Sequence, residues 1–248
     1  MSIITSKLTG KNVLLIGGTS GIGFAVAQKA LQEGAHITIS SSSEDKIANA
    51  VERLRASSPE HASNVRSYAA DLSVKDKIEA TVEGLLQYAA KNSTIDHVVF
   101  TAGNVPPMAP LAESSFEHVD AFLNVRFYAA LAIGKYAPKS LLQLKHPRKP
   151  TSWLPPIITN VIEGLMKGLA VTLAPIRVNV VAPGFILTEL LEKLPTEMAH
   201  ASIENAKAKS LTKNIGSPDD TSEAYLYFMK DSFVTGVVLD TNGGVFLS

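Results

Sequence analysis

The sequence predicts an α/β fold in which a doubly wound parallel sheet lies between two layers of helices, giving three layers α/β/α. Two observations support this prediction. Short apolar runs rich in β-branched residues alternate with longer stretches of helical periodicity, as βαβ units require. No linker, internal repeat or change of composition divides residues 1–248, so we expect a single domain. The predicted strands cover residues 13–16, 35–39, 65–70, 95–101, 176–181 and 237–240.

Helical periodicity fills the segments between these strands. Its clearest stripe is Val161, Leu165, Leu169 and Leu173, which repeats every four residues and so lies along one helix face. Ser217 is placed to cap the last helix, with a proline directly inside it. The predicted helices before it cover residues 21–34, 44–56, 74–91, 115–144 and 154–173.

The composition excludes several classes of protein. Hydrophobic residues make up 46% and charged residues 19%, a balance that excludes a disordered chain. Lysine plus arginine and aspartate plus glutamate are both 23, so the basic excess of a nucleic-acid-binding protein is missing. There is no apolar stretch of the roughly 18 residues that span a bilayer, and the N-terminus lacks the pattern of a signal peptide. We therefore expect a cytoplasmic protein whose partner is a small molecule, with no nucleic acid and no membrane.

Residues for thiol or metal chemistry are also missing. The chain has no cysteine, which excludes a disulfide framework, a thiol nucleophile and a thiolate metal site. Its 6 histidines are scattered without the spacing of metal ligands. We therefore expect no metal site.

A glycine-rich turn follows the first predicted strand. Gly17, Gly21 and Gly23 have the spacing G-x-x-x-G-x-G and lead into the first predicted helix. Glycines let the backbone approach a pyrophosphate closely, and a helix N-terminus offers N–H groups and partial positive charge to that anion. The turn predicts a dinucleotide cofactor; the alternative is a glycine-rich turn with no ligand. The residues expected to contact the cofactor here are Gly17, Thr19, Ser20, Gly21 and Ile22.

The end of the second predicted strand favours NADP(H) over NAD(H). An acidic residue at this point would hold the ribose 2′-hydroxyl and repel a 2′-phosphate. Here the strand ends in Ser40, Ser41 and Ser42, whose hydroxyls can donate to a phosphate. Glu44 and Asp45 come later and are expected to lie at the start of the next helix. The alternative is that the serines only form a polar loop.

Further motifs occur in order along the chain. Asp71-Leu72 follows the third predicted strand, and Thr101-Ala102-Gly103 follows the fourth. The motifs after these are Asn124, Arg177-Val178-Asn179, Pro183-Gly184 with Thr188, and Asn242-Gly243-Gly244. Together with the glycine turn, they resemble the short-chain dehydrogenase/reductase family over nearly the whole length. The resemblance implies a Rossmann-type fold that binds a nicotinamide dinucleotide.

The resemblance also implies roles for single residues. Asp71 would contact the adenine, although taken alone it could instead cap the following helix. Because the helices at 115–144 and 154–173 pack against a partner subunit in that family, a homodimer or homotetramer is expected. The implied cofactor contacts are Asp71 and Leu72 at the adenine, Ala102 and Gly103 at the ribose, and Pro183, Gly184, Ile186 and Thr188 around the nicotinamide carboxamide.

The chain departs from the family at its catalytic pair. The family uses Tyr-x-x-x-Lys, in which the tyrosine exchanges a proton with the carbonyl oxygen and the lysine lowers the tyrosine pKa. No tyrosine of this chain has a lysine four positions later, and none occurs between residues 137 and 224. Pro155 and Thr159 stand where the pair would fall. The segment from Asn124 to Pro155 is also short, about where a central fifth strand with a catalytic serine would lie, and a true deletion of that strand would open the sheet.

This combination is similar to a fungal branch of the family that lacks the pair. The branch includes the reductase/Diels–Alderase proteins of bridged indole alkaloid biosynthesis. The similarity rests on residues 10–28, 125–127, 150–153 and 163–171.

Two functions remain open from the sequence. Hydride transfer to a carbonyl needs a proton donor, whereas an iminium becomes a neutral amine without one. The first function is an atypical NADPH-dependent oxidoreductase of fungal secondary metabolism, acting on an iminium or other pre-activated substrate, with or without a coupled cyclisation. The second is an NADP-binding protein without a redox role, either a cyclase or a pseudoenzyme. The candidates for substrate contact are Asn124, Arg126 and Trp153; the alternatives are a solvated charge for Arg126 and a packing anchor for Trp153.

Overall fold

The computed structural model describes residues 5–103, 115–141, 161–189, 191 and 196–247. Four parallel strands form one sheet in the order β3-β2-β1-β4. Two further parallel strands, β5 and β6, pair with each other. The strands are β1 (Asn12–Ile16), β2 (His36–Ser41), β3 (Val65–Ala69), β4 (His97–Phe100), β5 (Val180–Pro183) and β6 (Val238–Thr241).

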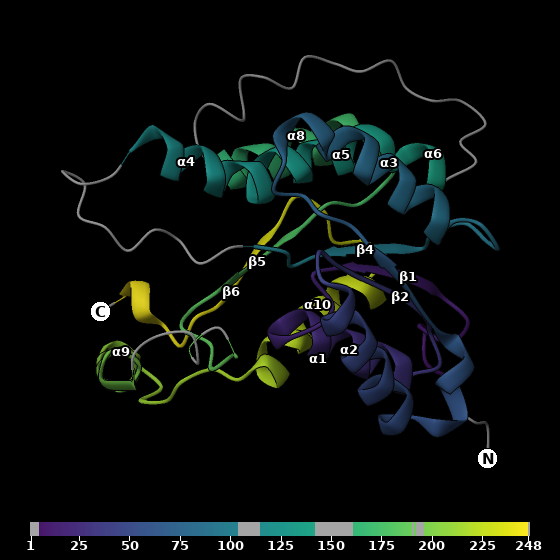
Figure 1. The fold of residues 1–248 in the computed structure, drawn as a ribbon. Coiled ribbons are helices and arrows are strands. Elements are labelled where there is room, and N and C mark those ends of the chain that lie inside the picture. Colours follow the sequence, from purple (N-terminus) through teal and green to yellow (C-terminus); the bar gives the residue numbers. More distant parts are fainter. Residues whose placement is uncertain (1–4, 104–114, 142–160, 190, 192–195, 248) are drawn as a thin grey trace.

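Helices cover both faces of the strands, as Figure 1 shows. On one face lie α1 (Gly21–Gln32), α2 (Glu44–Ser57) and α10 (Pro218–Lys230). On the other lie α3 (Ile78–Ala89), α5 (Ala129–Tyr136) and α8 (Val161–Thr172). The doubly wound, three-layered α/β fold predicted from the sequence is therefore confirmed. The remaining elements are α4 (Phe116–Leu123), a π-helical turn (Asn124–Tyr128), α6 (Pro138–Leu141), α9 (Thr196–Lys209) and 3₁₀ turns at Pro59–Asn64, Lys75–Lys77 and Val245–Leu247. In the described parts of the chain, no helix is both long and apolar enough to cross a bilayer.

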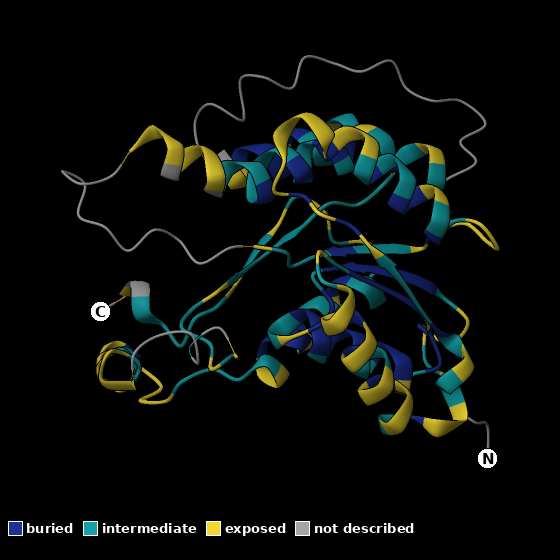
Figure 2. Ribbon diagram, in the orientation of Figure 1, coloured by how far each residue is buried: buried dark blue, intermediate teal, exposed yellow. Residues whose placement is uncertain are grey.

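The core lies on both sides of β1, whose five residues are all buried. Val13 and Leu15 belong to an apolar cluster with α1, whereas Leu14 and Ile16 belong to a second cluster with α3. Successive side chains of a strand point to opposite faces, so the apolar run Val13–Ile16 serves both clusters. Figure 2 shows the result, with buried residues on the sheet and on the helix faces turned toward it. The C-terminal end of β1 is thereby fixed in place, and the glycine turn begins there.

One predicted strand begins later in the structure than expected, and two predicted helices extend into residues that the structure does not describe. The helical stretch predicted over 115–144 is present as far as Leu141, as α4, the π-helical turn, α5 and α6 in succession, and Pro138, which lacks an N–H, begins α6. The strand predicted over 176–181 begins only at Val180. The side chain of Asn179 instead donates to the Val234 carbonyl at 3.1 Å and accepts from the Val237 amide at 3.1 Å. The helix predicted from 154 is described only from Val161 onward.

The strands do not form one continuous sheet in the described part of the chain. There, β4 pairs with β1 and β5 pairs with β6, and no described strand joins β4 to β5. This division falls where the sequence predicts that the central strand is missing. The segment concerned, residues 142–160, lies outside the described residues.

Candidate functional site

One large cavity lies at the C-terminal ends of β1 and β4 and continues between β4 and β5. Its volume is about 2100 Å³. It is lined by residues from separate segments that the fold brings together, and all the cofactor contacts predicted from the sequence are among them. These are Gly17, Thr19, Ser20, Gly21, Ile22, Ser40, Ser41, Ser42, Asp71, Leu72, Ala102, Gly103, Pro183, Gly184, Ile186 and Thr188.

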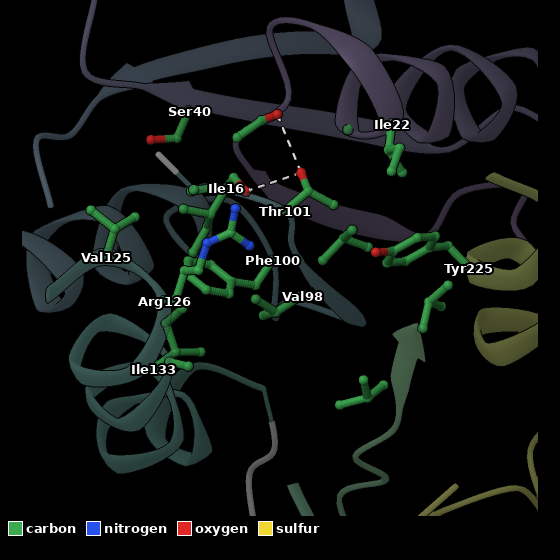
Figure 3. A pocket seen from close by; sticks show the side chains of 18 of the residues that line it. Ile16, Ile22, Ser40, Val98, Phe100, Thr101, Val125, Arg126, Ile133 and Tyr225 are labelled. Carbon is green, nitrogen blue, oxygen red and sulfur yellow. Dashed lines mark hydrogen bonds between the residues drawn. The ribbon is translucent and has the colours of Figure 1, made fainter. Parts of the chain in front are cut away.

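The glycine turn is held between the ends of two strands. Gly17 has a φ of +94°, and a Cβ there would lie 2.5 Å from the backbone nitrogen of Ala102. A Cβ on Gly23 would overlap the Gly17 carbonyl oxygen. The hydroxyl of Thr101 donates to the carbonyls of Ile16 and Gly17, at 3.4 and 3.3 Å (Figure 3). The turn therefore presents bare backbone to the cavity, a surface that fits the close approach of a diphosphate.

Helix α1 begins at the cavity without a local cap. Ser20 is the N-cap residue, but its side chain makes no capping hydrogen bond, and the first turn holds no acidic residue. The Gly21 amide donates to a carboxylate oxygen of Glu189 from a distant segment, at 2.8 Å. The start of α1 thus holds a carboxylate of the chain itself, as the partial positive charge of a helix N-terminus favours.

The serine run after β2 lines the same cavity. Ser40 is fully buried, and its hydroxyl has no hydrogen-bond partner among the described residues. The hydroxyl of Ser41 accepts from the Ser43 amide at 3.5 Å. Ser43 is the N-cap of α2, accepting from the Lys46 amide at 3.4 Å. Ser40, Ser41 and Ser42 therefore face the cavity, whereas Ser43 has a structural role.

Sequence reasoning missed a polar face of α2 beside these serines. Lys46, Asn49 and Arg53 all line the cavity. The guanidinium of Arg53 lies over the Phe24 ring, 4.1 Å from the ring centroid. Residues three and seven positions apart share one helix face, so the spacing 46/49/53 was the signal that could have revealed this group. With Asp45 as the one acid of α2 in the lining, the net charge of this face is positive.

Asp71 and Asn124 meet at the loop after β3. A carboxylate oxygen of Asp71 accepts from the Ser73 amide at 2.9 Å, which lowers the pKa of Asp71. The side-chain amide of Asn124 donates to the Ser73 carbonyl at 3.2 Å. Asp71 lines the cavity and Asn124 does not. Asn124 thus supports the loop that carries Asp71, and in this structure it does not reach the space where a substrate would lie.

Arg126 extends into the cavity from the π-helical turn. Its guanidinium carbon would lie 2.7 Å from a Cβ on Gly103. Figure 3 shows the side chain directed toward Ile16 and Thr101, at the ends of β1 and β4. Burial lowers the pKa of Arg126 from its ordinary value, and arginine remains charged at neutral pH. The cavity therefore holds a cation beside Gly103. Trp153, the third predicted substrate contact, lies outside the described residues.

Comparison with known proteins identifies the family. The profile of the SDR-like Rossmann domain matches residues 4–248. The chain belongs to the short-chain dehydrogenase/reductase (SDR) family. Among its relatives is the short-chain dehydrogenase/reductase malC of Malbranchea aurantiaca, which is 38% identical over 97% of this chain and 96% of its own length. The short-chain dehydrogenase/reductase fsr5 of Gibberella fujikuroi is 37% identical over 98% and 97%.

Solved structures agree with this assignment. The MalC reductase/Diels–Alderase of Malbranchea aurantiaca superposes with a TM-score of 0.85 at 38% identity, covering 97% of this chain and 98% of MalC. A short-chain dehydrogenase of Burkholderia cenocepacia in complex with NADP has a TM-score of 0.75 at 23% identity, covering 97% and 100%, and shows the fold alone. The similarity to MalC thus extends over nearly the whole length of this chain and of MalC.

The described part of this SDR cavity lacks an activated proton donor. Tyr225 is the one tyrosine among the described lining residues, and burial raises its pKa to about 12. Lys46 is the one lysine in that lining and comes from α2, whereas Tyr225 comes from α10. Burial also lowers the pKa of His97 to about 4, so its imidazole is neutral at pH 7. The described lining therefore contains no Tyr–Lys pair and no acid matched to neutral pH.

Much of the cavity lining between β4 and β5 is apolar, although His97, Arg177 and Asn179 also line the cavity. Ligand pockets commonly measure about 300–1,000 Å³, so this cavity has room for a second molecule beside a dinucleotide. Figure 3 shows Val98 and Phe100 of β4 together with Ile133 of α5 directed into this space. Its apolar lining includes Val98, Phe100, Ile133, Leu165, Leu169 and Val180.

Proposed function

We propose that this SDR protein is an NADPH-dependent reductase of fungal secondary metabolism that acts on an iminium or another substrate already activated for hydride transfer. The observation that supports the proposal is a cavity lined by all the residues that the sequence predicts to contact a dinucleotide, without a Tyr–Lys pair in its described lining. The similarity to MalC, a reductase/Diels–Alderase, supports a reaction coupled to cyclisation. The proposal takes residues 1–248 as one domain.

In this proposal, the cofactor is held along the C-terminal edge of the sheet. The bare backbone at Gly17 and the start of α1 would take the diphosphate. The unpartnered hydroxyl of Ser40 and the basic face of α2 fit a 2′-phosphate. The other contacts would be Ser41, Ser42, Lys46 and Arg53 at the 2′-phosphate, Asp71 and Leu72 at the adenine, Ala102 and Gly103 at the ribose, and Pro183, Gly184, Ile186 and Thr188 at the nicotinamide.

The described cavity lining holds no acid suited to donate a proton at neutral pH, and this favours one class of substrate. A reduced nicotinamide, when bound, supplies hydride. A carbonyl acceptor would acquire negative charge on oxygen and need a proton, which the described lining is poorly equipped to give. In an iminium, the C=N electron pair becomes the lone pair of a neutral amine, and no proton is required. Arg126 would bind an anionic or carbonyl oxygen of the substrate, leaving the cationic carbon toward the apolar part of the cavity.

A single-turnover experiment tests the redox half of the proposal. The protein loaded with NADPH is mixed with a cyclic iminium ion, and NADPH absorbance is followed. We expect NADPH to be oxidised in proportion to the enzyme present. NADPH that is bound but never oxidised by a panel of cyclic iminium ions would instead support the second function, an NADP-binding protein without a redox role. The second function is a candidate because the sequence lacks Tyr-x-x-x-Lys, the catalytic pair of the family.

NADPH is expected to bind more tightly than NADH, and Ser42→Asp should reverse this preference. An aspartate beside the 2′-phosphate would replace a donor by a negative charge. We expect it to weaken NADPH binding by about 10- to 100-fold, the value of one to two charge-assisted hydrogen bonds. Titration calorimetry with both dinucleotides measures this. The matched control, Ser42→Asn, has nearly the same shape without the charge and should keep the preference for NADPH. Equal or better NADH binding by the unmodified protein would contradict the expectation.

A homodimer or homotetramer is also proposed. Exposed apolar side chains lie on α4 and α8, among them Phe116, Val119, Ile162 and Val171. Such residues on neighbouring helices favour burial against a second copy. Sedimentation at micromolar concentration should therefore give a species heavier than 26.4 kDa, and a monomer of that mass would refute the assembly.

A further inference from the structure

The carboxylate of Glu189 lies at the position proposed for the cofactor diphosphate. One of its oxygens accepts a hydrogen bond from the Gly21 amide at 2.8 Å. A Cβ on Gly21 would lie 3.7 Å from that oxygen and 3.2 Å from the methyl carbon of Thr188. Ser20, Gly21, Thr188 and Glu189 all line the cavity. The segment after the Pro183-Gly184 turn therefore crosses to the start of α1 and places a negative charge on it.

The contact has a clear electrostatic cause. The first turn of α1 carries a partial positive charge, and neither Ser20 nor an acidic residue of that turn balances it. Glu189 supplies the missing anion from 168 residues away in the chain. The same two features, exposed amides and partial positive charge, attract the diphosphate of a dinucleotide.

We propose that Glu189 competes with the cofactor diphosphate for the start of α1 and thereby sets the affinity for the cofactor. The inference rests on the proposed function. A carboxylate that remained beside the diphosphate would repel it, since both are negative and close together. Cofactor binding therefore requires the Glu189 side chain to turn away, and because this side chain is exposed, it has solvent to turn into.

Two variants separate the charge of Glu189 from its contact. Glu189→Gln removes the charge with little change in shape, and Glu189→Ala removes the whole contact. We expect the Kd for NADPH, measured by titration calorimetry, to fall about tenfold in Glu189→Ala and by an intermediate factor in Glu189→Gln. In the absence of ligand, Glu189→Ala should lower the Tm by about 1–3 °C, because α1 loses its cap. Competition predicts that Glu189→Ala binds NADPH more tightly although its Tm is lower. Non-specific destabilisation of the fold would instead weaken NADPH binding.

Glu60→Gln is the matched control. Glu60 is an exposed carboxylate in the 3₁₀ turn before β3, at the opposite edge of the sheet from the glycine turn, and it does not line the cavity. Its loss changes the net charge by the same amount, so it should leave the NADPH affinity within twofold of the unmodified protein. An unchanged or weakened NADPH affinity in Glu189→Ala would overturn the inference.

Inorganic pyrophosphate keeps the inference testable if the proposed function fails. If no variant binds NADPH, the cofactor assignment is wrong, but the competition at α1 can still be measured. Thermal stabilisation by millimolar pyrophosphate should then be larger in Glu189→Ala than in the unmodified protein. Equal stabilisation of the two proteins would show that Glu189 does not occupy an anion site.

Discussion

Gly17→Ala is expected to weaken NADPH binding more than about 100-fold and to lower the Tm by about 5–10 °C. The φ of +94° at Gly17 is unfavourable for any residue with a Cβ. That Cβ would also lie 2.5 Å from the backbone nitrogen of Ala102 and 2.8 Å from its Cα. Because these are backbone atoms at the end of β4, the turn itself must move, and the diphosphate position moves with it. Calorimetry and a thermal unfolding curve measure the two effects.

Gly10→Ala is the control for backbone strain without overlap. Gly10 also has a positive φ, +72°, but no atom lies within 4 Å of the position of its Cβ. We expect a loss of about 2–4 °C in Tm and an unchanged Kd for NADPH. The differences in Tm and in Kd between the two variants therefore measure the effect of steric overlap between the glycine turn and the end of β4. Gly17→Ala with unmodified NADPH affinity would mean that the cofactor does not bind at this turn.

Simple ketones and aldehydes are expected to react about 10²–10⁴ times more slowly than cyclic iminium ions with the same bound NADPH. This factor is the usual contribution of a positioned general acid, which the described lining lacks. The raised pKa of Tyr225 makes it a weak donor, and His97 is neutral above its pKa of about 4. Steady-state NADPH oxidation at pH 7 with both acceptor classes measures the ratio. Turnover of simple ketones near the common enzyme value of about 10 per second would contradict the proposed function.

Two variants sharpen this comparison. Tyr225→Phe should leave the slow ketone reaction unchanged, because a tyrosine with a pKa of about 12 gives little general-acid help. Pro155→Tyr combined with Thr159→Lys should not create ketone reduction by itself. The segment from Asn124 to Pro155 is short where the family's central strand and catalytic serine would lie, and those two substitutions do not supply that serine. A ketone rate restored by this double variant would show that only the pair was missing.

Features set by local sequence were predicted well. β1 to β4 lie within two residues of their predicted boundaries, because each is a short apolar run bounded by polar or glycine residues. The glycine turn and the serine run were found for a related reason. Their chemistry depends on backbone N–H groups and small side chains in consecutive residues, and neighbouring residues are close in any fold.

Features set by distant partners were predicted poorly. The start of β5 was placed too early, because Asn179 bonds to Val234 and Val237, more than fifty residues away. The helical stretch predicted over 115–144 is present as far as it is described, but its apolar periodicity did not reveal the π-helical turn that holds Arg126. Periodicity reports which face is buried and does not report the hydrogen-bonding pattern along the helix.

The family, the parallel α/β layers and the loss of the catalytic pair could all be read from the residues in order. Only the tertiary structure showed that Lys46 and Arg53 of α2 line the same cavity as the serine run and that Glu189 reaches the start of α1. The physical reason is that the interaction between charges depends on their separation in space. Gly21 and Glu189 are 168 residues apart in the chain and 2.8 Å apart at the hydrogen bond, and it is the fold that brings them together.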